Sequence, residues 1–175
     1  MMQKRLRPMN REDLPQVLNW RNHPDVRQFM YTSHVITPEE HARWYARMSC
    51  QEGIWLLIFE VGAVAKGFVN ISRTRCQHVA DWGFYLSPDS EKGTGKLLGR
   101  AVLEYAFDEL GLHKLCGQAL GFNERSIRFH ERLGFNREGV LRDQHCDGNG
   151  FHDVVCFGLL SSEWRCGNRQ REGHQ

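Results

Sequence analysis

The chain has 175 residues, of which 41% are hydrophobic and 25% charged, and its formal net charge is +2. At about 100–200 residues per domain, this length predicts one compact domain with its own core. We find no run of about 18 apolar residues and no apolar stretch behind the basic start, so we expect a cytoplasmic protein with no membrane span or secretory signal. The nearly balanced charge argues against binding to nucleic-acid phosphates.

The first half of the chain alternates between strand and helix patterns. Pro38 precedes Glu39 and Glu40, and a proline is favoured in the first turn of a helix because its missing N–H would have no partner there. A Gly-Ala turn separates two later apolar runs, which therefore predict a hairpin. The expected elements are a strand at Leu6, a helix over 13–20, a restart at Pro24, a helix from Pro38, and strands over 54–59 and 67–71.

The second half continues the alternation and predicts a mixed α/β sheet. Apolar residues recur with helical spacing from Leu97 to Ala106, which predicts a long helix over 95–110. Asn123 and Gly134 are suited to begin and end a helix. The remaining expected elements are strands over 81–86, 114–120 and 154–160, another near Phe135, and a tail without apolar periodicity from residue 165.

The six cysteines lack any C-x-x-C spacing; they stand at positions 50, 76, 116, 146, 156 and 166. Without a signal peptide, we expect them to be reduced structural thiols. A zinc site built from His145, Cys146, His152 and Cys156 matches no ligand framework. We therefore expect no metal.

The segment from Tyr85 to Ala106 is the first that indicates chemistry. The predicted strand ends at Leu86, and Glu91-Lys92-Gly93-Thr94-Gly95-Lys96 leads into the long helix. Glycines let the backbone approach a ligand, and the N–H groups of a helix start attract anions. A pyrophosphate is the expected ligand, and the alternative is a glycine-containing helix start with none. The spacing matches neither G-x-G-x-x-G nor the Walker loop.

A second segment, Asn123 to Phe135, reads NERSIRFHERLGF. Together the two segments resemble the GCN5-related N-acetyltransferases, in the family's order and over roughly residues 4–160. The resemblance implies that the first loop binds the pyrophosphate of acetyl-CoA and that the second segment completes the site. Two positions depart from the pattern: Ser90 stands where the loop usually opens with Gln or Arg, and His130 stands where tyrosine is usual.

The resemblance implies a single α/β domain over residues 1–164, with a flexible tail over 165–175. Its mixed sheet would have six or seven strands, flanked by about four helices and opened between the strands at 81–86 and 114–120. The pantetheine arm would add to the open strand edge through main-chain hydrogen bonds. The implied acetyl-CoA ligands are Leu86, Lys92, Gly93, Thr94, Gly95, Lys96, Asn123, Ser126 and Phe129.

The segment from Trp20 to Tyr31, followed by His41-Ala42-Arg43-Trp44-Tyr45, is similar to nucleotide-sugar N-acetyltransferases of pseudaminic acid biosynthesis. That similarity implies acetylation of the 4-amino group of UDP-4-amino-4,6-dideoxy-N-acetyl-β-L-altrosamine. A flat base favours soft or stacking partners, and a diphosphate favours a guanidinium. Alternatively, Trp44 and Met30 belong to the core, and Arg21 pairs with Asp25. The implied substrate-side residues are Arg21, Met30, Tyr31, His41, Trp44 and Tyr85.

Other acceptors remain open. The segments 138–143 and 147–154 also occur in ribosomal-protein N-terminal acetyltransferases and in spermidine acetyltransferases. A polyamine would require an acidic pocket, whereas the N-terminal segment here is basic and aromatic. A non-catalytic acyl-CoA-binding module is a further alternative, and the sequence is compatible with a monomer or a homodimer.

The family resemblance implies direct attack of a neutral amine on the thioester, without a nucleophilic cysteine. We expect Asp81 to be the general base, with a pKa raised by a dry pocket or with help from water. Asn70 on the neighbouring strand is a further candidate for the same pocket. His130 is the candidate proton donor to the thiolate, since imidazolium is competent near neutrality. The alternatives are an edge charge at position 81 and a hydrogen-bonded helix-face histidine at position 130.

Overall fold

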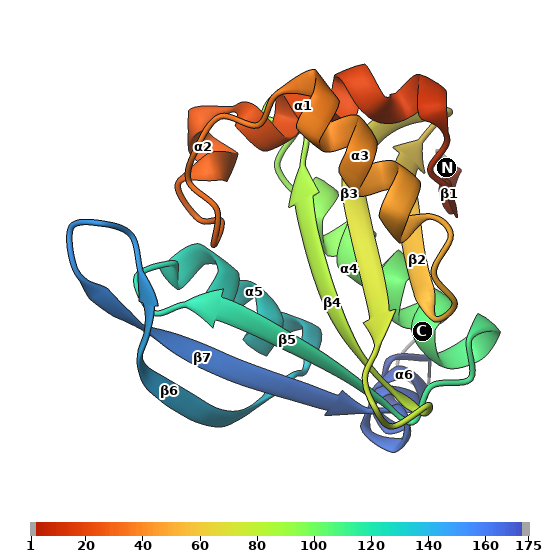
Figure 1. Cartoon of the computed structure of the whole chain (residues 1–175). Helices are drawn as coiled ribbons and strands as arrows, with labels where there is room; N and C mark the ends of the chain where they lie inside the picture. The colour runs from red at the N-terminus through yellow and green to blue at the C-terminus, as the bar shows by residue number, and fades with distance from the viewer. Residues whose placement is uncertain (1–2, 173–175) are drawn as a thin grey trace. The chain divides into compact units, whose positions relative to one another are not determined.

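The computed structural model of the chain describes residues 3–172 and has an α/β fold (Figure 1). Seven strands form one mixed sheet: β1 Lys4–Pro8, β2 Ile54–Val61, β3 Val64–Arg73, β4 Val79–Leu86, β5 Lys114–Leu120, β6 Asn136–Cys146 and β7 Phe151–Leu160. The helices within the same residues are α1 Leu14–Asn22, α2 Pro24–Arg27, α3 Pro38–Met48, α4 Thr94–Glu104, α5 Glu124–Leu133 and α6 Ser161–Glu172. A 3₁₀ turn, η1 Arg11–Asp13, precedes α1, and a π-helical turn, η2 Tyr105–Glu109, follows α4.

The strand order is β1-β2-β3-β4-β5-β7-β6. β4 and β5 pair in parallel over three residue pairs, Val79–Asp81 with Lys114–Cys116, while β5 with β7 and β6 with β7 are antiparallel. The prediction of a mixed sheet with six or seven strands is confirmed. The described residues contain six α-helices, whereas the family resemblance implied about four. α2 is a single turn of four residues, and α6 lies largely in the predicted tail.

The chain divides into two compact units. The first contains residues up to Ser72 together with Gly83–Val102, and therefore β1–β3, the end of β4, α1–α3 and most of α4. In this unit α1 and α3 lie side by side (Figure 1). One cluster of its buried core contains Met9, Val17, Trp20, Leu56, Ile58 and Phe68.

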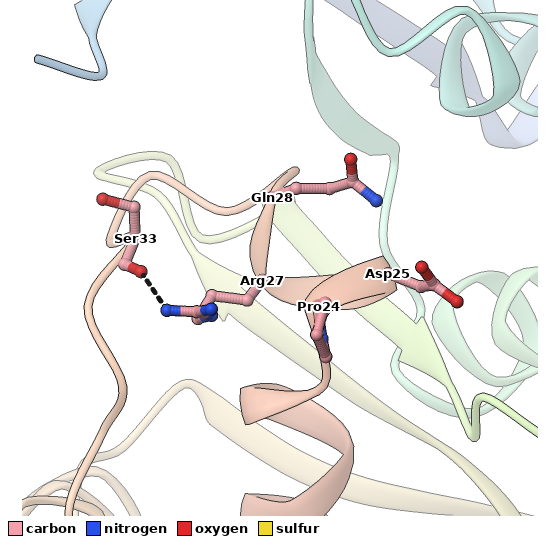
Figure 2. Close-up of a pocket in the computed structure, with 5 residues that line it drawn as sticks. All are labelled: Pro24, Asp25, Arg27, Gln28 and Ser33. Carbon is pink, nitrogen blue, oxygen red and sulfur yellow. Dashed lines mark hydrogen bonds between the residues drawn. The ribbon is translucent and has the colours of Figure 1, made fainter. Parts of the chain in front are cut away.

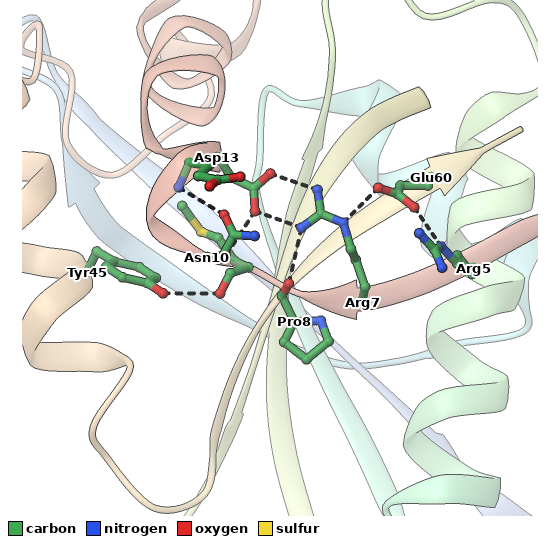
Figure 3. A network of polar contacts seen from close by, with 9 residues as sticks. Arg5, Arg7, Pro8, Asn10, Asp13, Tyr45 and Glu60 are labelled. Carbon is green, nitrogen blue, oxygen red and sulfur yellow. Dashed lines mark hydrogen bonds and ion pairs between the residues drawn. The ribbon is translucent and has the colours of Figure 1, made fainter. Parts of the chain in front are cut away.

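A partly buried ion-pair network joins β1, β2 and η1 in the first unit (Figure 3). Arg7 donates through Nη1 and Nη2 to the two oxygens of Asp13, at 2.7 Å each, and through Nε to Oε1 of Glu60 at 2.7 Å. The other Glu60 oxygen accepts from Arg5 Nε at 2.6 Å. These hydrogen bonds lower the pKa of Glu60, and they lower the pKa of Asp13 in spite of its burial. The network fixes the point where the chain enters α1.

The second unit contains Arg73–Trp82 and the chain from Leu103 onward. Phe107, Leu115, Phe157 and Leu159 are almost completely buried in it. Residues 165–172, where a flexible tail is predicted, continue α6 as far as Glu172; Trp164 anchors this helix against Phe107, with ring centroids 6.5 Å apart. The rest of the predicted tail, residues 173–175, lies outside the described residues, and the boundary at residue 164 stays a prediction. Within residues 3–172 no helix is long and apolar enough to cross a bilayer.

Candidate functional site

The loop between β4 and α4 is held by one carbonyl of β3. The Ser87 amide donates to the Lys66 carbonyl at 2.9 Å, and Ser90 Oγ donates to the same oxygen at 3.2 Å. Gly93 has a φ of +97°, a backbone conformation that residues other than glycine adopt only with strain. The Leu97 amide then donates to the Gly93 carbonyl at 3.3 Å and closes the first turn of α4.

The start of α4 presents donors that suit an anion. The Thr94 amide donates to the Glu91 carbonyl at 3.2 Å. The amides of Gly95 and Lys96, also in the first helical turn, have no intrahelical acceptor by the geometry of a helix. Lys92 and Lys96, which are close to these amides in the sequence, are exposed. Amides, helix dipole and ammonium groups together form a donor set that fits a pyrophosphate.

A close approach at Gly67 sets the position of this loop relative to the sheet. A Cβ at Gly67 would lie 2.9 Å from Leu98 Cδ1 of α4, 2.9 Å from the Tyr85 carbonyl oxygen and 3.2 Å from Leu86 Cδ2. Only a glycine on β3 leaves room for both α4 and the end of β4. Leu86, the predicted partner of the pantetheine arm, therefore has a fixed position in the first unit.

Four of the six predicted substrate-side residues form one cluster in the first unit: Arg21, His41, Trp44 and Tyr85. The rings of His41 and Trp44 stack, with centroids 5.2 Å apart. Trp44 then contacts Phe68 edge-on at 5.9 Å, and Phe68 contacts Tyr85 at 5.1 Å. Trp44 also packs against the core of this unit, so the alternative of a core residue is partly correct.

Arg21 is the charged member of this cluster. Its Nη2 donates to the Thr32 carbonyl at 2.9 Å, whereas its Nη1 is buried and has no hydrogen-bond partner in the structure. Burial lowers the pKa of Arg21, and burial together with the charge of Arg21 lowers the pKa of His41. Burial raises the pKa of Tyr85, which stays protonated. No ion pair joins Arg21 to Asp25 in the described structure, where Asp25 lies 3.8 Å from His23 instead.

Met30 and Tyr31 lie on the loop over residues 28–37, between α2 and α3. The side-chain amide of Asn22 makes two hydrogen bonds to the Ile36 backbone. It accepts from the Ile36 N–H at 2.9 Å and donates to the Ile36 carbonyl at 2.8 Å. Met30 is half-buried, and Tyr31 is exposed. The loop thus holds Tyr31 at the surface while α1 anchors it.

Asn70 of β3 lies opposite Gly83 of β4 in the first unit. The Asn70 Oδ1 atom is 2.7 Å from the position that a Cβ at Gly83 would occupy. The amide of Asn70 therefore fills the space that the missing side chain of Gly83 leaves.

Asp81 belongs to the second unit, where it pairs in register with Cys116 of β5. It is exposed, and partial burial of its carboxyl raises the pKa of Asp81; its role as the base stays a prediction. Burial, reinforced by the carboxylates of Asp81 and Glu138, raises the pKa of Cys116 and of Cys156. The thiolate forms are therefore disfavoured, which fits a mechanism without a nucleophilic cysteine.

His130 is buried within an aromatic cage. It stacks on Phe157 with ring centroids 4.8 Å apart and contacts Trp82 and Phe135 edge-on. Its Nδ1 lies 2.8 Å from the Ser126 carbonyl, which can only accept, so Nδ1 carries a proton and Nε2 of the neutral ring carries none. Burial lowers the pKa of His130 and favours that neutral ring. These surroundings give little support to a proton donor, and that role stays a prediction.

The predicted second cofactor segment begins α5 as expected. The Asn123 side chain accepts from the Ser126 amide at 3.1 Å, and Gly134 ends the helix with a φ of +99°. Phe129 contacts Trp82, with ring centroids 6.3 Å apart. In the structure, Asn123 and Ser126 form a helix cap, and their predicted contacts with acetyl-CoA stay predictions.

One residue of the zinc site considered from the sequence, His152, pairs with a carboxylate. His152 Nε2 lies 2.9 Å from Asp147 Oδ2 at the turn between β6 and β7. Cys146 and Cys156 are free thiols, like the other four cysteines. Across residues 3–172, no group of three or more His, Cys, Asp or Glu side chains is arranged to hold a metal ion.

Comparison with known proteins places the chain in a family. Residues 4–136 match the family model of the acetyltransferase (GNAT) domain, and the chain belongs to that family. It is an acetyl-CoA-dependent N-acetyltransferase.

Known proteins of this family match over most of the chain. The chain is 30% identical over 137 residues to the acetyltransferase PseH of Campylobacter jejuni. This match covers 75% of this chain and 82% of the relative. The chain is 26% identical over 162 residues to the spermidine N(1)-acetyltransferase of Escherichia coli, spanning 91% of this chain and 87% of that protein. The spermidine N-acetyltransferase of Vibrio cholerae, solved with CoA and spermine, has the same fold, with a TM-score of 0.84 at 22% identity; the match covers 93% of this chain and 98% of that one.

Proposed function

We propose that the acceptor is a UDP-linked amino sugar, acetylated at its 4-amino group, as in UDP-4-amino-4,6-dideoxy-N-acetyl-β-L-altrosamine of pseudaminic acid biosynthesis. One observation carries this proposal: Arg21 is a half-buried cation whose Nη1 has no partner within the protein. A buried charged donor left unpaired is costly, and an anionic ligand would relieve that cost.

The surroundings of Arg21 support a nucleotide rather than a simple anion. His41, Trp44 and Tyr85 supply flat rings beside the guanidinium, and Met30 and Tyr31 lie on the loop that Arg21 anchors. Stacking rings suit a uracil base, and a guanidinium suits a diphosphate. The similarity to the acetyltransferase PseH, whose matched segment includes most of this chain, points in the same direction.

Spermidine is the second candidate acceptor, because the Escherichia coli spermidine acetyltransferase matches a larger share of the chain. A polyamine carries several positive charges and requires carboxylates. The cluster around Arg21 is cationic, and no carboxylate forms an ion pair with Arg21 in the described structure. Like charges at short range repel, so this cluster disfavours a polyamine.

For the chemical step we propose direct attack of the amine on the thioester, with Asp81 accepting the amine proton, directly or through water. The raised pKa of Asp81 makes it a stronger base than an ordinary aspartate. Asn70 is proposed to orient a polar group by its amide. Acetyl-CoA supplies the activated acetyl group, and the amides of Gly95 and Lys96, with Lys92, are proposed to bind its pyrophosphate; Leu86, Gly93, Thr94, Asn123, Ser126 and Phe129 complete the proposed set.

The test is an acceptor panel. Turnover of acetyl-CoA, measured as free thiol, is compared for the UDP-amino sugar, spermidine and a peptide with a free N-terminus. We expect kcat/KM to be at least 100-fold higher for the sugar nucleotide. A higher value for spermidine or the peptide would contradict the proposal.

A pair of variants tests the role of Arg21 within the same assay. Arg21→Gln should raise the KM for the sugar nucleotide about tenfold or more, because a charge-assisted hydrogen bond is lost. Arg47→Gln, an exposed arginine on α3, is the matched control and should change nothing. Equal KM values for the two variants would remove Arg21 from the proposed site.

A further inference from the structure

An open hollow of about 460 Å³ lies beside the loop that follows α2 in the first unit. It is lined by Pro24, Asp25, Arg27, Gln28 and Ser33 (Figure 2). Figure 2 shows Arg27 directed toward Ser33, whereas Asp25 and Gln28 point away from that pair. None of these five residues belongs to the site set expected from the sequence.

Two guanidinium groups anchor adjacent carbonyls of this loop. Arg21 Nη2 donates to the Thr32 carbonyl at 2.9 Å, and Arg27 Nη1 donates to the Ser33 carbonyl at 3.1 Å. Each guanidinium has five N–H donors, so both keep donors that these bonds do not use. In Arg21 one such group, Nη1, is buried without a partner.

The two arginines are close in space and are not neutralised by carboxylates. Burial, and secondarily the charge of Arg27, lowers the pKa of Arg21. Among the described residues, neither arginine forms an ion pair with Asp or Glu, and the nearest acidic residue in the sequence, Asp25, has a side chain that is 79% exposed and lies 3.8 Å from His23. Two like charges held together in this way repel each other unless an anion lies between them.

We propose that Arg21 and Arg27 together form a two-guanidinium cradle for the diphosphate of the acceptor, with Arg27 as a specificity-determining residue. This inference rests on the proposed function, since it takes the acceptor to be nucleotide-linked. A diphosphate carries oxygens on two phosphorus atoms and accepts from both guanidinium groups at once, which a single carboxylate or a cationic polyamine does not do. Binding also fixes the loop of Met30 and Tyr31, because the same two side chains hold its backbone.

The experiment measures the binding of UDP, and separately of inorganic pyrophosphate, by calorimetry to the full chain. Saturating coenzyme A is present throughout, so that phosphates do not occupy the cofactor site. Arg27→Gln keeps a donor for the Ser33 carbonyl but removes the charge, and Arg47→Gln is the matched control. We expect Arg27→Gln to weaken the Kd for UDP about tenfold and to reduce its salt dependence, with the KM for acetyl-CoA and the melting temperature unchanged.

The outcomes separate this inference from the proposed function. If UDP binds equally to the wild type and to Arg27→Gln, or binds to neither, the cradle is refuted, whatever the acceptor panel shows. If UDP binding depends on Arg27 while the UDP-amino sugar is not acetylated, the proposed sugar is wrong, but the cradle stands and the acceptor is another diphosphate-linked amine.

Discussion

The close approach at Gly67 gives the most quantitative prediction. An alanine there would place its Cβ 2.9 Å from both Leu98 Cδ1 and the Tyr85 carbonyl oxygen. The leucine side chain can rotate, but the carbonyl belongs to β4, so the strand end or α4 must shift. Overpacking of this kind costs about 1–3 kcal/mol, and the smaller entropy of an unfolded alanine chain returns about 0.4–1 kcal/mol. We expect a net loss of about 1–2 kcal/mol.

Urea unfolding measures this loss directly, and a domain of this size should show a fall in Tm of about 3–6 °C. The KM for acetyl-CoA should rise as well, because Leu86 and the start of α4 move together. Gly139→Ala is the control: a Cβ there meets no atom within 4 Å, and the backbone φ of Gly139 is not positive. If Gly67→Ala is as stable as Gly139→Ala, the described packing of α4 on β3 is incorrect.

Three further predictions follow from buried or shifted charges. Arg7→Met should destabilise the fold by about 2–3 kcal/mol at pH 7 in urea unfolding, because charge-assisted hydrogen bonds are lost and two carboxylates keep fewer partners. The folded-state pKa values of Asp13 and Glu60 are lowered, so this difference should shrink as the pH falls below the ordinary carboxyl range and toward those lowered values, where the folded-state carboxylates become protonated. A loss below 1 kcal/mol would contradict it. Asp81→Asn should remove the rising limb of the pH–rate profile, and a limb left unchanged would exclude Asp81 as the base. His130→Phe tests the predicted proton-donor role: that role requires a loss of kcat above tenfold with little change in the KM for acetyl-CoA, and a kcat within about threefold of the wild type would remove His130 from the mechanism.

Local sequence signals predicted the helices that begin or end at a residue with a strong positional preference. Pro38 begins α3, Asn123 caps α5 and Gly134 ends it, each for the expected stereochemical reason. The apolar spacing from Leu97 onward also predicted α4, but not the change to a π-helical turn at Tyr105. The spacing of apolar residues is too similar in an α-helix and in a single π-helical turn to tell the two apart from the sequence.

Tertiary contacts decided what the sequence left open. α6 has little apolar periodicity and depends on Trp164 packing against Phe107, a partner 57 positions away. The sequence identifies Arg21 as a candidate. Its hydrogen bond to Thr32 and the burial of Nη1, however, depend on how the loop over residues 28–37 packs against α1. Arg27 was missed for the same reason, since nothing in its sequence context distinguishes it from a solvated arginine.

In the proposed complex, acetyl-CoA binds with its pyrophosphate on the amides that begin α4. The most direct measurement is a titration of isotopically labelled protein with coenzyme A, followed by NMR at the backbone amides. We expect the amide signals of Gly93, Gly95 and Lys96 to shift most strongly and to saturate together. If coenzyme A binds while these three signals stay in place, the ligand lies elsewhere and the proposed complex is wrong.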